Sequence, residues 1–207
     1  MPSLRSRLLA EADSIGLSLA DEVLSQVEDY INLLKKWSRA VNLTSIKGDR
    51  EIFRYHFLES FYCSRFLGEK GRLADIGSGA GFPGLALKLL RPGLKIWLIE
   101  PRQKRAFFLK EVIRQLDLKD VEVVQQRLEA LPQGSIQRVD YISSRAMGKF
   151  RAIARWSRQV LTAEGWILLL MSNKDVARLE AAGLRLIQKH RLPTRKEGII
   201  ALCQPER

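Results

Sequence analysis

The spacing of apolar residues changes near residue 70 of this chain. Before that point apolar positions recur at steps of one to four, the spacing of amphipathic helices, and Ser18 is expected to cap the second helix. The three predicted helices cover residues 4–15, 19–37 and 51–67. Later in the chain, short continuous apolar runs take over. The pattern therefore predicts an N-terminal helical extension, residues 1–70, and a core, residues 71–207, that forms one compact unit.

The second part of the chain reads as strands separated by helical stretches. The strand candidates are residues 73–76, 95–100, 121–126, 139–143, 166–171, 184–190 and 198–203. Helical stretches fill the gaps, notably at 103–116 and 150–161. Most of these strands are too continuously apolar to be half exposed, so we expect helices on both faces of the sheet. Only seven residues separate the last two strands, which favours an antiparallel hairpin. The fold class predicted is α/β, with a seven-stranded, doubly wound sheet, and the strand order along the chain resembles the class I S-adenosylmethionine-dependent methyltransferase fold.

A glycine-rich turn follows the first predicted strand. Residues 73–84 read L-A-D-I-G-S-G-A-G-F-P-G, with Gly77, Gly79 and Gly81 at alternate positions. The dinucleotide pattern G-x-G-x-x-G would need glycine where Phe82 stands, and the G-K-[ST] of phosphate-binding loops is missing. A G-x-G-x-G turn after the acidic strand end at Asp75 is typical of S-adenosylmethionine (SAM) binding. A glycine-rich turn without a ligand is the alternative.

Ligands in doubly wound sheets bind at the carboxyl ends of the strands. Phe82 is expected beside the methionine part of SAM. Glu100 ends the second strand, where a carboxylate accepts hydrogen bonds from both ribose hydroxyls. Leu128 and Glu129 follow the third strand and are expected to meet the adenine through backbone groups. Arg145 follows the fourth strand, where we expect it to position the cofactor or the substrate.

The end of the fourth strand also limits the reaction. The [DNS]-P-P-[YF] motif used to methylate exocyclic base amines is missing there. Methylation at base carbon needs a cysteine nucleophile, and neither Cys63 nor Cys203 follows a suitable strand end. Guanine N7 has a free lone pair and no proton to lose, so its methylation needs positioning rather than a general base. Methylation of a ring nitrogen fits the residues present.

Charge and composition indicate the partner. The 207 residues carry a net charge of +12, which favours a polyanion, and nucleic acid over a membrane. Two cysteines and two histidines do not build a usual metal site, so we expect no metal. No segment has the pattern of a signal peptide or of a membrane span, so we expect neither. A monomer in the reducing cytoplasm is expected. Basic groups that suggest a phosphate-backbone track are 35–54, 149–158 and 189–196.

Several short motifs together resemble one family, the small-subunit (16S) ribosomal RNA guanine-N7 methyltransferases, also called glucose-inhibited division protein B. The matching segments are residues 37–46 (W-N-x-x-x-N-L-T-x-I), 56–60 (H-x-x-D-S), 75–84 (D-x-G-T-G-x-G-x-P-G), 104–105 (K-R) and 144–146 (S-R-A). The resemblance implies a SAM-dependent enzyme acting on small-subunit ribosomal RNA or the 30S particle. It implies cofactor contacts from Gly77, Phe82, Leu128, Glu129 and Arg145.

The resemblance also makes Asn42 and His56 candidate catalytic residues, with a capping and packing role as the alternative. Ser78 stands where the family pattern has Thr, and two further departures bear on the site. Glu59 replaces Asp, and its longer side chain is expected to orient His56 or Arg145. Lys-Gly is missing after the fifth strand, where Lys174 is a candidate substitute.

Three other functions stay open. They are a SAM-dependent methyltransferase for another RNA or a protein, a nicotinamide-dependent oxidoreductase, and an RNA-binding relative without catalysis. Phe82 argues against the oxidoreductase, and an intact glycine loop with Glu100 argues against the silent relative.

Overall fold

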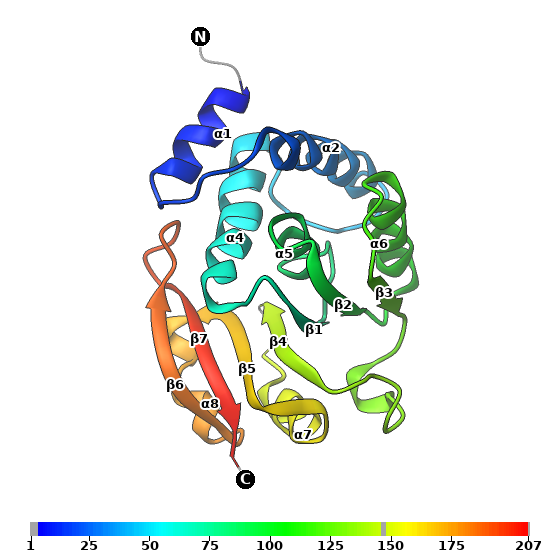
Figure 1. The fold of residues 1–207 in the computed structure, drawn as a ribbon, viewed down its shortest axis with the longest axis vertical. Helices are drawn as coiled ribbons and strands as arrows, with labels where there is room; N and C mark the ends of the chain where they lie inside the picture. Colours follow the sequence, from blue (N-terminus) through cyan, green and yellow to red (C-terminus); the bar gives the residue numbers. More distant parts are fainter. Residues whose placement is uncertain (1–3, 146–147, 207) are drawn as a thin grey trace.

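One mixed β-sheet forms the centre of the computed structural model, which describes residues 4–145 and 148–206 (Figure 1). Its strands are β1 (Lys70–Ile76), β2 (Gly93–Ile99), β3 (Val121–Val124), β4 (Val139–Arg145), β5 (Leu161–Ser172), β6 (Leu184–Arg191) and β7 (Gly198–Pro205). Within the described residues the strand order is β3-β2-β1-β4-β5-β7-β6. The first five strands run parallel, and β7 pairs antiparallel with both β5 and β6. All seven predicted strands and the closing hairpin are confirmed.

The largest difference from the predicted strands is the start of β5. The strand begins at Leu161, five residues before the apolar run, because Leu161 pairs with Val139 of β4. Residues 162–165 after Leu161 are polar, exposed or glycine, so no continuous apolar run marks this part of the strand.

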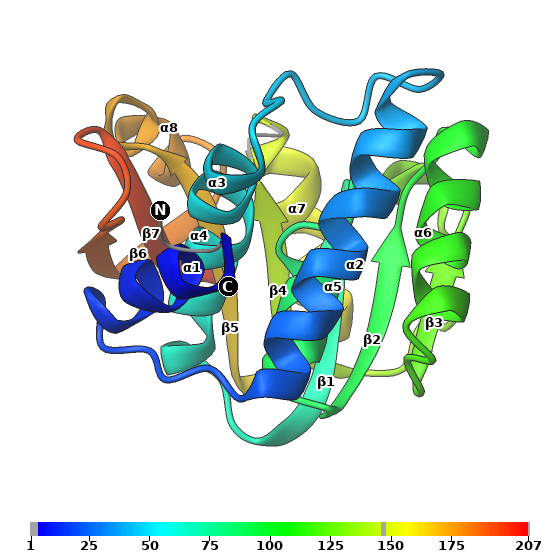
Figure 2. The same ribbon diagram turned by 90° about the horizontal axis from the view of Figure 1, so that it is seen from above.

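Helices cover both faces of the sheet, as expected (Figures 1 and 2). One face carries α1 (Leu4–Asp13), α2 (Asp21–Ser38), α5 (Gly84–Leu90) and α6 (Gln103–Gln115). The other carries α7 (Phe150–Val160) and α8 (Ala177–Glu180). Alternate strand residues face the two layers: Leu98 packs with the first, and Trp97 and Ile99 pack with the second. This alternation explains why the strands are apolar throughout.

The helical N-terminal part packs into the same core as the sheet. Tyr30 and Phe57 lie in one hydrophobic cluster with Leu85 of α5 and Phe108 of α6. The expected Ser18 cap is wrong, because α2 begins at Asp21 after Ala20, without a side-chain cap. Acidic residues in its first turn stabilise the helix dipole instead. The division of the chain at residue 70 stays a prediction.

The third predicted helix is present but irregular. It consists of α3 (Asp49–Ile52), a π-helix η1 (Phe53–Leu58), α4 (Glu59–Cys63) and a 3₁₀ turn η2 (Ser64–Phe66). A π-helix inserted in a helical segment often accompanies a functional site. Here it carries Tyr55 and His56, and Glu59 follows it directly.

The topology places a crevice at the end of β1. The chain leaves β3 at one edge of the sheet and returns to β4, on the other side of β1. In open α/β sheets such a reversal leaves a crevice at the carboxyl ends of the strands. The glycine turn after β1 and Arg145 at the end of β4 therefore meet there. Among the described residues, no helix has the length and hydropathy needed to cross a membrane.

Candidate functional site

Two serine hydroxyls join β4 to β1 beneath the crevice. Ser143 Oγ donates to Asp75 Oδ1 at 2.7 Å, and Ser144 Oγ donates to the Ile76 carbonyl at 2.9 Å. The second oxygen of Asp75, Oδ2, is buried and has no hydrogen-bond partner among the described residues. Burial raises the pKa of Asp75 to about 6. Asp75 is therefore a buried structural residue that links β1 to β4 beneath the crevice.

The glycine turn is fixed by the helical layer above it. The Tyr30 hydroxyl, from α2, donates to the Ala80 carbonyl at 2.8 Å. Gly81 has φ +86°, and a Cβ on it would overlap the Tyr30 hydroxyl oxygen. Gly79 has φ +56°, and the nearest atoms to a Cβ there lie 3.7 Å away. Gly81 is therefore required by packing, whereas a Cβ at Gly79 would make only ordinary contacts, so the positive φ is what favours glycine there.

Phe82 packs inward, against aromatic rings of the helical layer. Its ring stacks on Tyr30, with centroids 5.4 Å apart, and on His56, with centroids 4.7 Å apart. Phe57 meets it edge-on at 5.0 Å. With the side chain 5% exposed, a ligand in the crevice would meet mainly the backbone of this turn.

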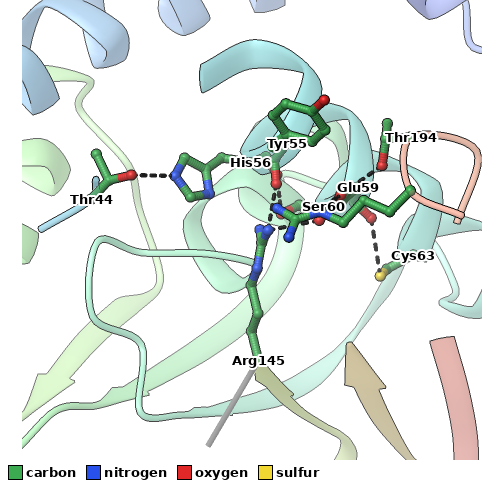
Figure 3. Close-up of polar contacts among 9 residues, drawn as sticks. Thr44, Tyr55, His56, Glu59, Ser60, Cys63, Arg145 and Thr194 are labelled. Carbon is green, nitrogen blue, oxygen red and sulfur yellow. Dashed lines mark hydrogen bonds and ion pairs between the residues drawn. The ribbon is translucent and has the colours of Figure 1, made fainter. Parts of the chain in front are cut away.

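His56 is held between the turn and a loop of the N-terminal part. Its Nε2 lies 2.8 Å from Thr44 Oγ1, which also accepts a hydrogen bond from the Ile46 amide (Figure 3). Its Nδ1 is buried without a partner in the described part of the chain. Burial, reinforced by Arg145 and Arg195, lowers the pKa of His56 to about 3. The imidazole is therefore neutral at neutral pH.

Glu100 closes the other side of the turn. Its side chain is 3% exposed, and its oxygens accept hydrogen bonds from the Gly79 amide at 3.0 Å and the Arg102 amide at 2.9 Å. Each carboxylate oxygen retains acceptor capacity for a ligand hydroxyl. The structure thus places Glu100 beside the glycine turn, where the ribose contact is predicted.

The loop after β3 forms a short 3₁₀ turn, η3 (Leu128–Ala130). Leu128 is buried in the core, and Glu129 pairs with Lys149 at 2.9 Å. The turn follows the strand next to β2, so its backbone lies on the same edge of the sheet as Glu100.

Arg145 reaches from the end of β4 to the π-helix (Figure 3). Its Nη2 donates to the Tyr55 carbonyl and to Glu59 Oε2, the latter at 2.7 Å. Its Nη1 is buried and has no partner among the described residues. The guanidinium is thus fixed by one nitrogen while the other remains able to donate. Ala146, which completes the Ser-Arg-Ala match, lies outside the described residues.

Glu59 joins three segments that are distant in the sequence. It is 1% exposed, and its Oε1 accepts hydrogen bonds from Thr194 Oγ1 and Arg195 Nε, both at 2.6 Å. The Arg195 guanidinium also lies over the Tyr55 ring, 4.9 Å from its centroid. The expectation that Glu59 orients Arg145 is confirmed by these contacts. Arg195, expected on a phosphate track, is instead bonded to a buried carboxylate.

A cavity of about 510 Å³ opens beside this network, at the carboxyl ends of β4 and β5. Arg145, Arg195 and Glu59 line one side. Apolar side chains line much of the rest: Phe150, Ile153, Leu169, Met171 and Leu192. A hollow with apolar walls and a few charged groups is typical of a small-molecule or nucleobase site.

Two predicted residues stand apart from the network. Asn42 is exposed, and its carbonyl accepts a hydrogen bond from Arg105 Nη2 at 2.9 Å. Its side chain has no hydrogen-bond partner within residues 4–145 and 148–206. Lys174 lies in the 3₁₀ turn η4 (Asn173–Asp175) with an exposed side chain, and it does not line the cavity.

The sequence did not indicate three residues that bind the candidate site residues: Thr44 contacts His56, Tyr55 contacts Arg145, and Thr194 contacts Glu59. Tyr55 acts through its backbone carbonyl, which residue type does not reveal. One signal was available, because Glu59 is a charged residue within the apolar run F-L-E-S-F. A buried carboxylate requires partners, and two arginines supply them here.

Comparison with known proteins identifies the relatives of this chain. The family model described as "GidB: rRNA small subunit methyltransferase G" matches residues 23–194. Curated proteins named "Ribosomal RNA small subunit methyltransferase G" are similar to it. The one from Geotalea uraniireducens is 34% identical over 84% of this chain and 80% of its own length. The one from Halorhodospira halophila is 32% identical over 91% of this chain and 90% of its own length. The one from Roseiflexus castenholzii is 41% identical, but the match covers 65% of that protein.

Solved structures share the fold at low sequence identity. A SAM-dependent methyltransferase from Aquifex aeolicus superposes with a TM-score of 0.61 and 18% identity, over 74% of this chain and 92% of that one. Fibrillarin from Aeropyrum pernix, solved with natively bound S-adenosyl-L-methionine, superposes with a TM-score of 0.55 and 16% identity, over 70% of this chain and 72% of that one. The predicted class I methyltransferase fold is confirmed.

Proposed function

Because the chain belongs to the rRNA small subunit methyltransferase G family, we propose that it transfers the methyl group of SAM to guanine N7 in small-subunit ribosomal RNA. One observation carries the proposal. The glycine turn and Glu100 meet at the switch point of the sheet, and the cavity lined by Arg145 opens at the carboxyl ends of β4 and β5, on the same edge. A cofactor site and a base-sized hollow thus share one edge of the sheet.

The turn after β1 fits SAM. The missing side chain at Gly79 would let a ligand approach the backbone closely, and Glu100 would present carboxylate oxygens to the ribose. Leu128 and Glu129 would meet the adenine through their backbone groups. When bound, SAM supplies an electrophilic methyl group on a positively charged sulfur. The residues of this chain then have only to bind and orient the two reactants.

The cavity would receive the target guanine. Its apolar walls fit the faces of a base. Arg145 lines the cavity and would donate to guanine O6 after a side-chain shift that exposes its buried, unpartnered Nη1. N7 itself offers a lone pair and carries no proton, so in-line attack needs alignment and no general base. The neutral state of His56 agrees with this chemistry, because its buried ring acts as a support for Phe82.

Charge balance in the cavity also suits N7 methylation. The reaction moves a positive charge from sulfur to a base that is neutral before it is methylated. Two arginine charges at the cavity wall would oppose this transfer, but Glu59 is paired with both of them. The carboxylate thus lowers the positive potential where the new cation forms.

The polyanionic substrate accounts for the net charge of +12. We propose further that the protein acts in the cytoplasm, as a monomer, on ribosomal RNA or the 30S particle. A methyltransferase for another RNA or a protein is the competing function, because the glycine turn and Glu100 would serve any of these substrates equally.

A genetic comparison tests the proposal. Small-subunit ribosomal RNA from cells with and without the gene is digested and mapped for methylated nucleosides. We expect one 7-methylguanosine site to disappear with the gene and to return with the wild-type copy, but not with Arg145→Ala. An unchanged ribosomal RNA methylation map would contradict the proposal.

A further inference from the structure

The cavity beside Arg145 is lined by three carboxylates, and two of them are already paired. Glu59 accepts hydrogen bonds from Arg145, Thr194 and Arg195. Asp175 pairs with Arg178 at 2.7 Å. The third, Glu197, has no ion pair or hydrogen bond to its carboxylate from any residue that the structure describes. It is therefore the cavity carboxylate that is free to accept hydrogen bonds from a ligand.

The backbone of Glu197 is nevertheless well fixed. Its carbonyl accepts a hydrogen bond from the Asn173 amide at 2.8 Å. The next residue, Gly198, pairs with Ser172 at the end of β5. Glu197 is an exposed residue on this anchored backbone, and it lines the cavity at the carboxyl ends of β4 and β5. A side chain without partners on an anchored backbone is what a ligand contact requires.

Guanine presents both hydrogen-bond acceptors and hydrogen-bond donors. O6 and N7 are acceptors, whereas N1–H and the N2 amine are neighbouring donors. Because N7 must face the methyl donor, the remaining groups that can identify the base are O6 and the two donors. Recognition therefore needs one donor from the protein near O6 and one acceptor near N1 and N2.

Resting on the proposed function, we propose that Glu197 reads the target base by accepting hydrogen bonds from guanine N1–H and the N2 amine. Arg145 would supply the complementary donor to O6 from its unpartnered Nη1, which is buried until the side chain shifts toward the base. Both residues line the same cavity, whose apolar side chains would hold the faces of the ring. Adenine would be rejected, because its N1 is an acceptor and would meet the carboxylate without a hydrogen bond between them.

The test compares wild type, Glu197→Gln and Glu164→Gln. The control residue Glu164 is exposed near the start of β5, away from the cavity. GMP and AMP are used as competing inhibitors of ribosomal RNA methylation, since both carry a ribose phosphate and differ in the base. We expect GMP to inhibit wild type and the control at least about 10-fold more strongly than AMP. In Glu197→Gln the preference should fall below about 3-fold, because an amide presents both a donor and an acceptor.

A second measurement separates base reading from general damage. In single turnovers with saturating RNA, Glu197→Gln should methylate at least about 10-fold more slowly than wild type, with unchanged affinity for S-adenosylhomocysteine. A variant that keeps the wild-type GMP preference or the wild-type rate would overturn the role of Glu197. Equal inhibition of the wild type by GMP and AMP would overturn it as well. Failure of the wild type to form any 7-methylguanosine would instead refute the proposed function itself.

Discussion

Glu59 Oε2 lies 2.7 Å from Arg145 Nη2, although 85 residues separate the two in the sequence. The Glu59 side chain is 2% exposed and that of Arg145 is 15% exposed. Replacing a buried ion pair by apolar side chains often leaves the free energy of unfolding unchanged. A gain in stability is therefore not a sufficient reason for this pair. The pair instead fixes the position of the guanidinium, because it holds Nη2 and leaves the buried Nη1 without a partner among the described residues.

Removing this carboxylate should damage both the fold and the reaction. Breaking a buried pair by changing one partner costs about 3–5 kcal/mol, because the other charge is left uncompensated. We expect Glu59→Gln to lose about 3 kcal/mol of unfolding free energy in urea. Glu59→Asp should keep part of the network and lose less. Glu51→Gln, exposed on the same helical segment, serves as the control and should leave stability unchanged. Equal stability of Glu59→Gln and the control would show that the pair is not formed.

Methylation should require the complete guanidinium group of Arg145. Arg145→Lys keeps the charge but loses the fork that contacts Tyr55 and Glu59 while presenting Nη1. We expect both Arg145→Lys and Arg145→Ala to reduce the single-turnover methylation rate by about 100-fold, the usual effect of misplacing reactants. The wild-type rate should be flat from pH 6 to 9, because no group acts as a base. A wild-type rate in Arg145→Ala would show that the fourth-strand site is assigned to the wrong residue.

Local sequence pattern predicted the elements of this fold well, and it predicted their long-range partners poorly. The apolar runs gave every strand, because a strand covered on both faces must be apolar throughout. The glycine turn is also predictable from local sequence, because its backbone conformation restricts the residue type. Arg195 was grouped with surface charges, because its neighbours Lys196 and Arg191 are basic and exposed. Its partner Glu59 is 136 residues away, and no local spacing encodes such a contact.

The same limit applies to Phe82. Its place beside the glycine turn was predicted, whereas its contacts with Tyr30 and His56 depend on how the helical layer packs onto the sheet. The site residue predictions for Gly77, Glu100, Leu128 and Glu129 concern ligand contacts and stay predictions. Their positions at one edge of the sheet follow from the topology.

Asp75 should make stability depend on pH. Its folded pKa, raised to about 6 by burial, exceeds the unfolded value of about 3.9. The folded state therefore binds more protons between these values, and stability is lost as the pH rises through 6. Asp75→Asn keeps an acceptor for Ser143 and removes the charge. Relative to wild type, it should gain roughly 1.5 kcal/mol between pH 5 and pH 8, measured by urea unfolding. A difference that is constant with pH would contradict the raised pKa.

Salt dependence should reveal which end of α7 faces RNA. Arg151 lies in the first turn of this helix, next to Phe150, which lines the cavity. Arg158 lies in its last turn, where its Nε donates to the Glu206 carbonyl. RNA affinity should fall linearly on a log–log plot against salt, and Arg151→Ala should reduce the slope by about 0.7–0.9. Arg158→Ala is the matched control and should leave the slope unchanged. Equal slopes for all three proteins would place the RNA elsewhere.

The most direct measurement is methyl transfer by the purified protein. SAM with a labelled methyl group is incubated with small-subunit ribosomal RNA and with 30S particles from cells lacking the gene. The RNA is digested to nucleosides, which are separated and identified by mass. The account predicts label in 7-methylguanosine with at least one of these substrates, and none with Arg145→Ala. Label in another nucleoside or in ribosomal protein, or no transfer by protein that binds S-adenosylhomocysteine, would contradict it.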